Sequence, residues 1–239
     1  MECLSVDERF RNIDYNIDFI RERIAEAAVK SSVSPADIDF MAVTKTVEPI
    51  FVNRALEKGI SLIGENKVQE LLSKKPFLKL ENCKSHLIGH LQTNKVRQIV
   101  GEVSMIESVD SLKLAAEISK RSLAAGVTTD CLIEVNIGGE ESKTGISCEM
   151  LDELLHQIVE MPAIRVCGLM TIPPICDNKD LIKYFSKMHK IFIDIKDKKL
   201  DNTDISILSM GMSGDYEQAI LCGSNHVRIG SAIFGPRLY

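Results

Sequence analysis

The sequence lacks several features that identify common classes of protein. It has no excess of basic residues, because 29 Lys and Arg stand against 34 Asp and Glu and leave a formal net charge of -5. No general basic surface for nucleic acid is therefore expected. No apolar run is long enough to span a bilayer, and the first residues, MECLSVDERF, carry charges where a signal peptide needs an apolar segment. We expect a cytoplasmic protein that binds neither nucleic acid nor a membrane.

Cysteine and histidine patterns typical of metal sites are also missing. The seven cysteines run from Cys3 to Cys222 without a C-x-x-C pair, which fits incidental thiols in a reducing compartment better than a disulfide framework. His86 and His90 lie four residues apart, a spacing that could bind one metal on a helix. The run HLIGH indicates instead a strand that enters a glycine turn, so we expect no metal site.

The composition is that of an ordinary globular protein. Its 239 residues are 45% hydrophobic and 26% charged, which suits one large domain better than two. Residues 5–30 place Phe10, Ile13, Ile17, Ile20 and Ile24 at spacings of three and four, the pattern of an amphipathic helix. We expect a single domain over residues 1–239, with an N-terminal helix within residues 1–33 packed on the remainder.

Beyond the Ser-Pro pair at 34–35, short apolar runs alternate with helical patterns. The expected strands are Asp39–Thr44, Ser61–Gly64, His86–Gly89, Met105–Glu107, Cys131–Asn136, Arg165–Met170, Ile205–Ser209 and His226–Ile229. Expected helices between them include Glu48–Lys58, Ser111–Ala125, Cys148–Glu160 and Lys179–Lys198. Alternation of this kind predicts an α/β fold with a parallel sheet, and eight units in this length match a (β/α)8 TIM-type barrel. A doubly wound open sheet is the alternative, because periodicity cannot show closure.

Lys45 is the first residue with possible chemistry. It follows an apolar run and Thr44, so it lies where the first strand ends, which is the catalytic side of a barrel. A lone lysine at such a position is usually an ordinary surface residue. Polar or small residues also follow the second, third and fifth expected strands, at 64–66, 89–95 and 136–138. Together these segments predict a concave polar site at one end of the sheet.

The last two units suggest a site for an anion. The segment 209–215 follows the seventh expected strand, and 223–231 encloses the eighth. Small residues before short helices let backbone N–H groups approach an anion, and the loops after strands seven and eight are the usual phosphate site of a barrel. The hydroxyls of Ser213 and Ser231 would then hold a phosphate. The alternative is that these Gly and Ser residues only form tight turns and helix caps.

Eight longer motifs follow one another along nearly the whole chain. They are AVTKT at 42–46, IGENKVQE at 63–70, HLIGHLQTNK at 86–95, IESVDS at 106–111, VNIGGEESKTG at 135–145, GLMTIPP at 168–174, LSMGMSGD at 208–215 and VRIGSAIFG at 227–235. With these motifs the chain resembles the YggS/PROSC family of pyridoxal 5'-phosphate (PLP) homeostasis proteins, which is related in fold to the barrel domain of alanine racemase.

The resemblance implies a set of PLP-binding residues. Lys45 is implied to carry PLP as a Schiff base, and Arg228 to lie beside the pyridine nitrogen. The residues implied to hold the phosphate are Ser213, Gly230 and Ser231, and those implied to line the pocket are Asn66, His90 and Met210. The chain departs from the family pattern at Lys67, where Tyr is frequent, at Gly214, where Asn or Ala is typical, and at Asn225 and Ser231, which stand in for threonines. Ser231 keeps the hydroxyl, whereas Lys67 alters one wall of the expected pocket.

The resemblance also bears on activity. Arginine does not readily give up a proton, so the pyridine nitrogen should stay unprotonated and PLP should be a weak electron sink. Alanine racemases take a second acid/base from a further domain and the partner subunit, whereas this sequence ends at Tyr239, directly after the eighth unit. We therefore expect a monomeric PLP carrier or regulator, with other B6 vitamers as further ligands and apo PLP-dependent enzymes as partners. The alternatives are a racemase-like amino-acid enzyme of low or specialised activity and a pure interaction module.

Overall fold

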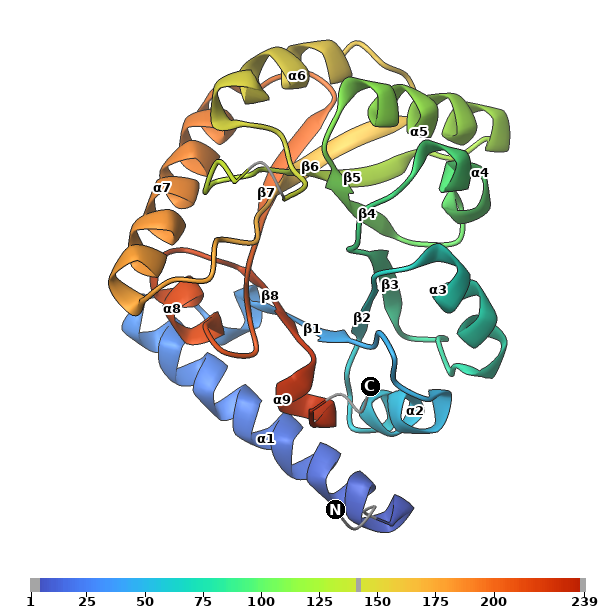
Figure 1. Cartoon of the computed structure of the whole chain (residues 1–239), viewed down its shortest axis with the longest axis vertical. Coiled ribbons are helices and arrows are strands. Elements are labelled where there is room, and N and C mark those ends of the chain that lie inside the picture. The colour runs from blue at the N-terminus through green and yellow to red at the C-terminus, as the bar shows by residue number, and fades with distance from the viewer. Residues whose placement is uncertain (1–4, 141–142, 237–239) are drawn as a thin grey trace.

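The chain folds into a closed barrel of parallel strands surrounded by helices (Figure 1). The computed structural model describes residues 5–140 and 143–236. Its strands are β1 Asp39–Val43, β2 Leu62–Glu65, β3 Lys84–Leu87, β4 Met105–Val109, β5 Thr129–Glu134, β6 Ile164–Met170, β7 Thr203–Met212 and β8 His226–Ile229. Each strand pairs with the next, and β1 pairs with β8 from Asp39↔His226 to Ala42↔Ile229. This closure confirms the predicted barrel, so the open-sheet alternative is wrong.

Helices cover the outside of the barrel. In the described part of the chain they are α1 Val6–Lys30, α2 Pro49–Glu57, α3 Val68–Lys74, α4 Val96–Ile99, α5 Leu112–Ala125, α6 Leu151–Ile158, α7 Asn178–Asp197, α8 Tyr216–Leu221 and α9 Ser231–Phe234. Short 3-10 helices cover Pro35–Asp37, Lys75–Phe77, Thr93–Lys95 and Cys148–Met150. The predicted helix 148–160 is thus divided into a 3-10 turn and α6. None of the described helices has both the length and the apolar character needed to cross a membrane.

The predicted N-terminal helix is present as α1, which lies outside the ring of βα units (Figure 1). Ser5 and Glu8 form a capping box at its start, and the side chains of Ile13, Ile17 and Ile20 are buried on one face. That face packs in a hydrophobic core shared with α2, α8 and β8. The amphipathic spacing of the isoleucines therefore attaches α1 to the barrel near the point where the first and last strands meet.

Side chains alternate between the two faces of the sheet, and the two faces differ in character. The outward side chains, such as Leu87, Ile106 and Met210, pack with the helices in the large core. The inward side chains include two small apolar groups, Met41, Val43, Leu62 and Ile88, and Met105, Leu132, Cys167 and Met170. They also include buried polar residues, namely His86, Glu107, Ser209, His226 and Arg228. The interior of a TIM barrel is usually packed with branched apolar residues, so this polar content is unusual.

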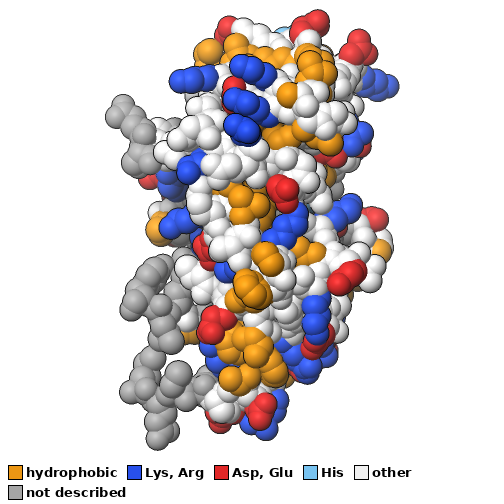
Figure 2. Space-filling view, turned by 90° about the vertical axis from the view of Figure 1, so that its right-hand side faces the viewer, with side chains coloured by type: hydrophobic (Ala, Val, Ile, Leu, Met, Phe, Trp, Pro, Cys, Tyr) orange, Lys and Arg blue, Asp and Glu red, His pale blue; other side chains and the backbone are white. Residues whose placement is uncertain are grey.

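The surface on the side that carries α3, α4 and α5 mixes both signs of charge. Figure 2 shows Lys and Arg side chains interspersed with Asp, Glu and apolar side chains across this face. Among the side chains coloured there, basic residues form no continuous stripe, in line with the net charge of the chain.

Candidate functional site

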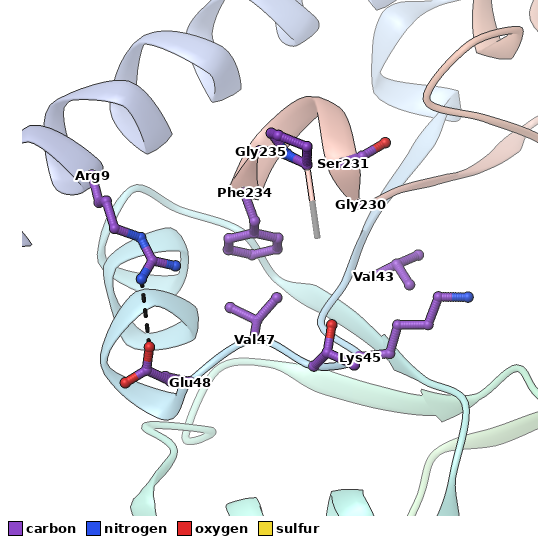
Figure 3. Close-up of a pocket in the computed structure, with 11 residues that line it drawn as sticks. Arg9, Val43, Lys45, Val47, Glu48, Gly230, Ser231, Phe234 and Gly235 are labelled. Carbon is purple, nitrogen blue, oxygen red and sulfur yellow. Dashed lines mark hydrogen bonds and ion pairs between the residues drawn. The ribbon is translucent and has the colours of Figure 1, made fainter. Parts of the chain in front are cut away.

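Lys45 lies just past the end of β1, between the ends of β2 and β8. It is half-buried and lines a cavity of about 210 Å³ together with Gly230 and Ser231 at the start of α9. Figure 3 shows the Lys45 amine and the Ser231 hydroxyl pointing to the same side, away from the ion pair between Arg9 and Glu48. Closure of the barrel thus brings the amine predicted from β1 beside the loop predicted from β8.

The backbone on both sides of Lys45 is tightly held. Thr46 has a φ of 63°, in the left-handed region that a β-branched residue rarely adopts. Its backbone N–H donates to Glu70 Oε1, and Lys74 Nζ donates to the backbone oxygen of Thr44 at 2.8 Å. Strain of this kind persists only where surrounding contacts impose it. Two side chains of α3 therefore fix the peptide units that flank Lys45.

A buried carboxylate bonds to Lys74 and Thr44 as well. The side chain of Glu65, at the end of β2, is fully buried, and its Oε1 accepts from Lys74 Nζ and from the Thr44 hydroxyl, each at 2.8 Å. Burial raises the pKa of Glu65, while the hydrogen bond from Lys74 acts in the opposite direction. We name the set of Glu65, Glu70 and Lys74 the lysine clamp, because it connects β2 and α3 to the turn that carries Lys45.

Two backbone amides meet at one point beside the cavity. The N–H groups of Gly230 and Ala232 both donate to Ser213 Oγ, at 3.1 and 3.2 Å. Ser213 itself lies after β7, where Asp215 accepts from the backbone N–H of Met212. Converging amides at the start of a helix form an anion site. The structure thus brings Ser213, Gly230 and Ser231 together, with the Ala232 amide beside them.

Arg228 lies inside the barrel beneath this end and is 4% exposed. Its guanidinium donates to Ser209 Oγ at 2.6 Å and to the backbone oxygen of Thr171 at 3.0 Å. Burial lowers the pKa of Arg228, and the charges of Glu107, Glu134 and Asp215 partly offset that effect. An arginine of this kind remains a cation and a donor at neutral pH.

The remaining predicted residues lie in different surroundings. Asn66 follows β2, and its buried Oδ1 has no hydrogen-bond partner among the described residues. His90, after β3, is exposed, and its Nδ1 lies 3.3 Å from Asp110 Oδ2. Lys67 is exposed at the start of α3. Met210 differs most from the expectation, because its fully buried side chain packs in the outer core, on the opposite face of β7 from Ser209.

Glycine positions two of these residues. A Cβ at Gly89 would lie 2.3 Å from the backbone oxygen of Asn66, so β3 can end against the Asn66 peptide only with glycine there. A Cβ at Gly230 would meet Val43 at 3.2 to 3.3 Å, so glycine at this position lets the start of α9 lie close to the end of β1.

Asn225 lies at the opposite end of β8, where its side chain bonds the backbone of Ser206 and Leu208.

Sequence reasoning missed several residues of the site. The sequence does not reveal the lysine clamp, because Glu70 and Lys74 have the i,i+4 spacing of any solvated ion pair on a helix. Glu107 and Ser209 were missed because a single polar residue within a strand gives no sign of which face it occupies. The Ala232 amide could have been predicted from the sequence, because the first N–H groups of any helix lack partners within the helix.

Comparisons with known proteins identify relatives of this chain. The family described as alanine racemase, N-terminal domain, matches residues 11–237. A pyridoxal phosphate homeostasis protein of Aquifex aeolicus is 41% identical over 92% of this chain and 96% of its own. One of Escherichia coli is 35% identical over 95% of this chain and 98% of its own. The structure of PipY of Synechococcus elongatus with PLP bound superposes with a TM-score of 0.78 at 27% identity, covering 90% of this chain and 100% of that one.

Proposed function

This chain belongs to the family of pyridoxal phosphate homeostasis proteins, which share the alanine racemase N-terminal domain, and from that premise we propose that it holds PLP as a Schiff base on Lys45. The observation that carries the proposal is that Lys45 and the start of α9 line one cavity, with two amides beside it converging on one oxygen. PLP carries its aldehyde and its phosphate on the same ring, so it needs an amine and an anion site that face the same space. The residues present fit both groups.

The proposed roles follow from the contacts. The phosphate binds at the amides of Gly230 and Ala232, with the hydroxyls of Ser213 and Ser231 as further donors. Arg228 donates toward the pyridine nitrogen from inside the barrel. Asn66 and His90 line the side of the pocket formed by β2 and β3, and the unpartnered Asn66 Oδ1 supports this assignment. Met210 is left out of the proposed set, because its side chain packs in the outer core.

The proposed activity is storage and delivery of PLP in B6 homeostasis. PLP supplies an electron sink for amino-acid chemistry, and its strength depends on a proton at the pyridine nitrogen. Arg228 donates to two neutral oxygens, Ser209 Oγ and Thr171 O. Because a guanidinium does not give up its proton at neutral pH, it would leave the pyridine nitrogen unprotonated. The second candidate is a racemase-like amino-acid enzyme of low or specialised activity, and the alanine racemase fold of the chain favours it.

The covalent assignment is tested by reduction and mapping. Borohydride treatment of the PLP-loaded protein should fix a pyridoxyl group on the peptide that contains Lys45. Lys45→Ala should abolish both the adduct and the visible absorption of the bound cofactor, whereas the matched control Lys67→Ala should retain both. An adduct on Lys67 or Lys95 in the wild-type protein would overturn the assignment.

The choice between carrier and enzyme is tested with amino acids in deuterated buffer. A carrier should exchange the α-proton of L-alanine far below the turnover of about 1–10³ s⁻¹ that is typical of enzymes, and it should transfer PLP to an apo PLP-dependent enzyme. Exchange or racemisation within that range would favour the racemase-like alternative. The same samples can be offered other B6 vitamers.

We also propose that the protein acts in the cytoplasm as a monomeric single domain. All six cysteines in the described part of the chain are free, which suits a reducing compartment. Sedimentation of the PLP-loaded protein over a range of concentrations tests the monomer. A mass that doubles with concentration would contradict it.

A further inference from the structure

The barrel interior contains a buried cluster of two histidines and one glutamate. Glu107 Oε1 lies 2.7 Å from His86 Nδ1 and 3.0 Å from His226 Nε2, and the side chains of Glu107 and His226 are fully buried. On its other side, His226 Nδ1 lies 3.5 Å from Asp39 Oδ2, whose side chain is 64% exposed at the start of β1. The cluster therefore connects the rim of the barrel opposite Lys45 to its centre.

A single hydroxyl connects this cluster to Arg228. The Ser209 hydroxyl donates to Glu107 Oε2 at 2.7 Å and accepts from the Arg228 guanidinium at 2.6 Å. The second guanidinium nitrogen donates to Thr171 O, which leaves Ser209 as the side chain that orients Arg228. Asp39, His226, Glu107, Ser209 and Arg228 thus form one polar chain along the barrel interior, which we call the axial chain.

The charges of the axial chain alternate in sign. Burial by itself lowers the pKa of His226, but the carboxylates of Glu107 and Asp39 outweigh it and raise that pKa to about 9. Burial would raise the pKa of Glu107, and His226 and His86 instead hold it well below its usual value. At neutral pH the order is therefore carboxylate, imidazolium, carboxylate and guanidinium. Buried charges are tolerated only when they are paired in this way.

We propose that Glu107 is a positioning residue, which holds Arg228 in place through the Ser209 hydroxyl. The consequence for bound PLP rests on the proposed function. When His226 loses its proton, Arg228 is the cation that remains to balance Glu107 through Ser209. The guanidinium is then drawn toward Glu107 and away from the cavity.

Other charged groups face the axial chain at both ends and at Glu107. Lys84 of β3 faces Asp39, and Glu134 of β5 and Asp215 after β7 face Arg228. His86 of β3 shares Glu107 with His226. A direct bond from a second carboxylate to Arg228 would bypass Ser209, and the described residues contain no such bond. The connection from Glu107 to Arg228 therefore passes through Ser209.

A metal ion is the competing occupant of the same cluster. The three residues have ligand types that suit zinc, and their ligand atoms lie within 4.8 Å of one another. The rings of His86 and His226 are stacked, however, with their planes 1° apart and centroids separated by 5.7 Å. Two of the three ligand atoms that zinc would need, His86 Nδ1 and Glu107 Oε1, instead hydrogen-bond to each other. The 2.7 Å contact between His86 Nδ1 and Glu107 Oε1 is a hydrogen bond. The 3.0 Å contact of His226 Nε2 with the same oxygen is an ion-pair contact without hydrogen-bond geometry.

Single substitutions can interrupt the axial chain at separate points. Ser209→Ala removes the link to Arg228 and leaves the histidine cluster intact. Glu107→Gln keeps the shape of the side chain and removes its charge. Asp39→Asn acts at the far rim, and Asp37→Asn is its matched control, because Asp37 is exposed and lies outside the chain. NMR of the histidine ring nitrogens in the PLP-free protein measures the pKa of His226 whether or not PLP binds, so it separates this inference from the proposed function.

The expected results form a pattern. The pKa of His226 should be near 9 in wild type, Ser209→Ala and Asp37→Asn, lower in Asp39→Asn, and lowest in Glu107→Gln. Loss of a charge-assisted hydrogen bond predicts that Ser209→Ala and Glu107→Gln weaken PLP binding about tenfold and shift its absorption. In Asp39→Asn the pH midpoint of PLP absorption should move down with the pKa of His226.

Three results would overturn the inference. One is a wild-type His226 that titrates below pH 7. Another is PLP affinity and absorption that are unchanged in both Ser209→Ala and Glu107→Gln. The third is stoichiometric zinc bound by the purified wild-type protein and lost in His226→Gln, which would identify a metal site instead. If wild type fails to bind PLP while His226 titrates near 9, the proposed function fails and the axial chain remains.

Discussion

The Ser213 hydroxyl shows how single atoms prepare the cavity for an anion. It accepts two backbone N–H groups from the start of α9, which would otherwise lack partners within the helix. A phosphate placed there would offer several acceptor oxygens to these N–H groups in place of Ser213 Oγ. The Ser213 hydroxyl could then donate to the phosphate. Ser231 lines the same cavity and contributes a second hydroxyl. Both serines are therefore expected to recognise the phosphate rather than the ring.

Replacing both hydroxyls should weaken PLP selectively. A hydrogen bond to a charged acceptor is typically worth about 1.5–3 kcal/mol, so each loss corresponds to roughly a ten- to hundredfold change in affinity. Ser213→Ala with Ser231→Ala should raise the dissociation constant of PLP far more than that of pyridoxal, as measured by titration of the absorption spectrum. Ser206→Ala, in an exposed part of β7, is the control. Equal weakening of PLP and pyridoxal would count against this phosphate site.

At the scale of elements, α3 determines the conformation of the turn after β1. Lys74 and Glu70 reach across from α3 to the two peptide units beside Lys45, and Glu65 brings a buried carboxylate from β2. The arrangement resembles a buried salt bridge. Removing one partner of such a pair destabilises a protein far more than replacing both partners by apolar residues. The lysine clamp therefore couples the packing of α3 to the position of Lys45.

Removing the cation of the clamp should destabilise the protein. Lys74→Met leaves the fully buried carboxylate of Glu65 without its cation, which typically costs about 3–5 kcal/mol of the free energy of unfolding. Urea denaturation should show this loss, and adding Glu65→Gln in the same protein should restore part of it. Lys75→Met is the matched control, because its pair with Glu102 is partly exposed and such pairs contribute about 0–1 kcal/mol. Similar losses for Lys74→Met and Lys75→Met would contradict the role of the clamp.

At the scale of the whole molecule, the axial chain runs through the barrel interior and makes folding depend on pH. The pKa of His226 is about 9 in the folded protein and close to 6.5 once the chain unfolds. A pKa that is raised by folding stabilises the folded state fully below the unfolded value. That stabilisation is lost as the pH rises through about 9. The relevant window therefore lies between pH 6.5 and 9.

The free energy of unfolding should accordingly fall by about 2 kcal/mol between pH 6 and 8.5 through His226 alone. Urea denaturation of wild type and His226→Gln at several pH values isolates this part, since the variant lacks the titrating group. His156→Gln, at an exposed position on α6, should behave as wild type. Thiols of the unfolded chain ionise at about pH 8.5, and their contribution is common to wild type and variant, so it cancels in the comparison. Parallel stability profiles for wild type and His226→Gln would rule out a charged His226.

Much of the architecture follows from the sequence alone. Alternating apolar runs and helical patterns are local features, so all eight strands and the N-terminal helix were predicted within a few residues of their observed bounds. The position of Lys45 at the end of the first strand is equally local. The small residues around Ser213 and Gly230 also indicated an anion site, because glycine and serine before a helix let backbone N–H groups approach an anion. Such features depend only on neighbours along the chain.

The tertiary structure alone decided which of these residues meet. Closure of the barrel depends on pairing between β1 and β8, whose residues are nearly 190 positions apart, and no periodicity reports it. The face of the strand that each residue occupies decided that Ser209 points inward to Glu107 while Met210 packs outward against the helices. A strand residue changes face with a shift of one position, so sequence patterns cannot resolve this in a strand buried on both sides. The axial chain exists for the same reason, because its members come from strands that lie far apart in the sequence and that only the closed barrel brings together. The lysine clamp depends on a nearer contact, the pairing of β1 with β2, which places α3 beside the turn that carries Lys45.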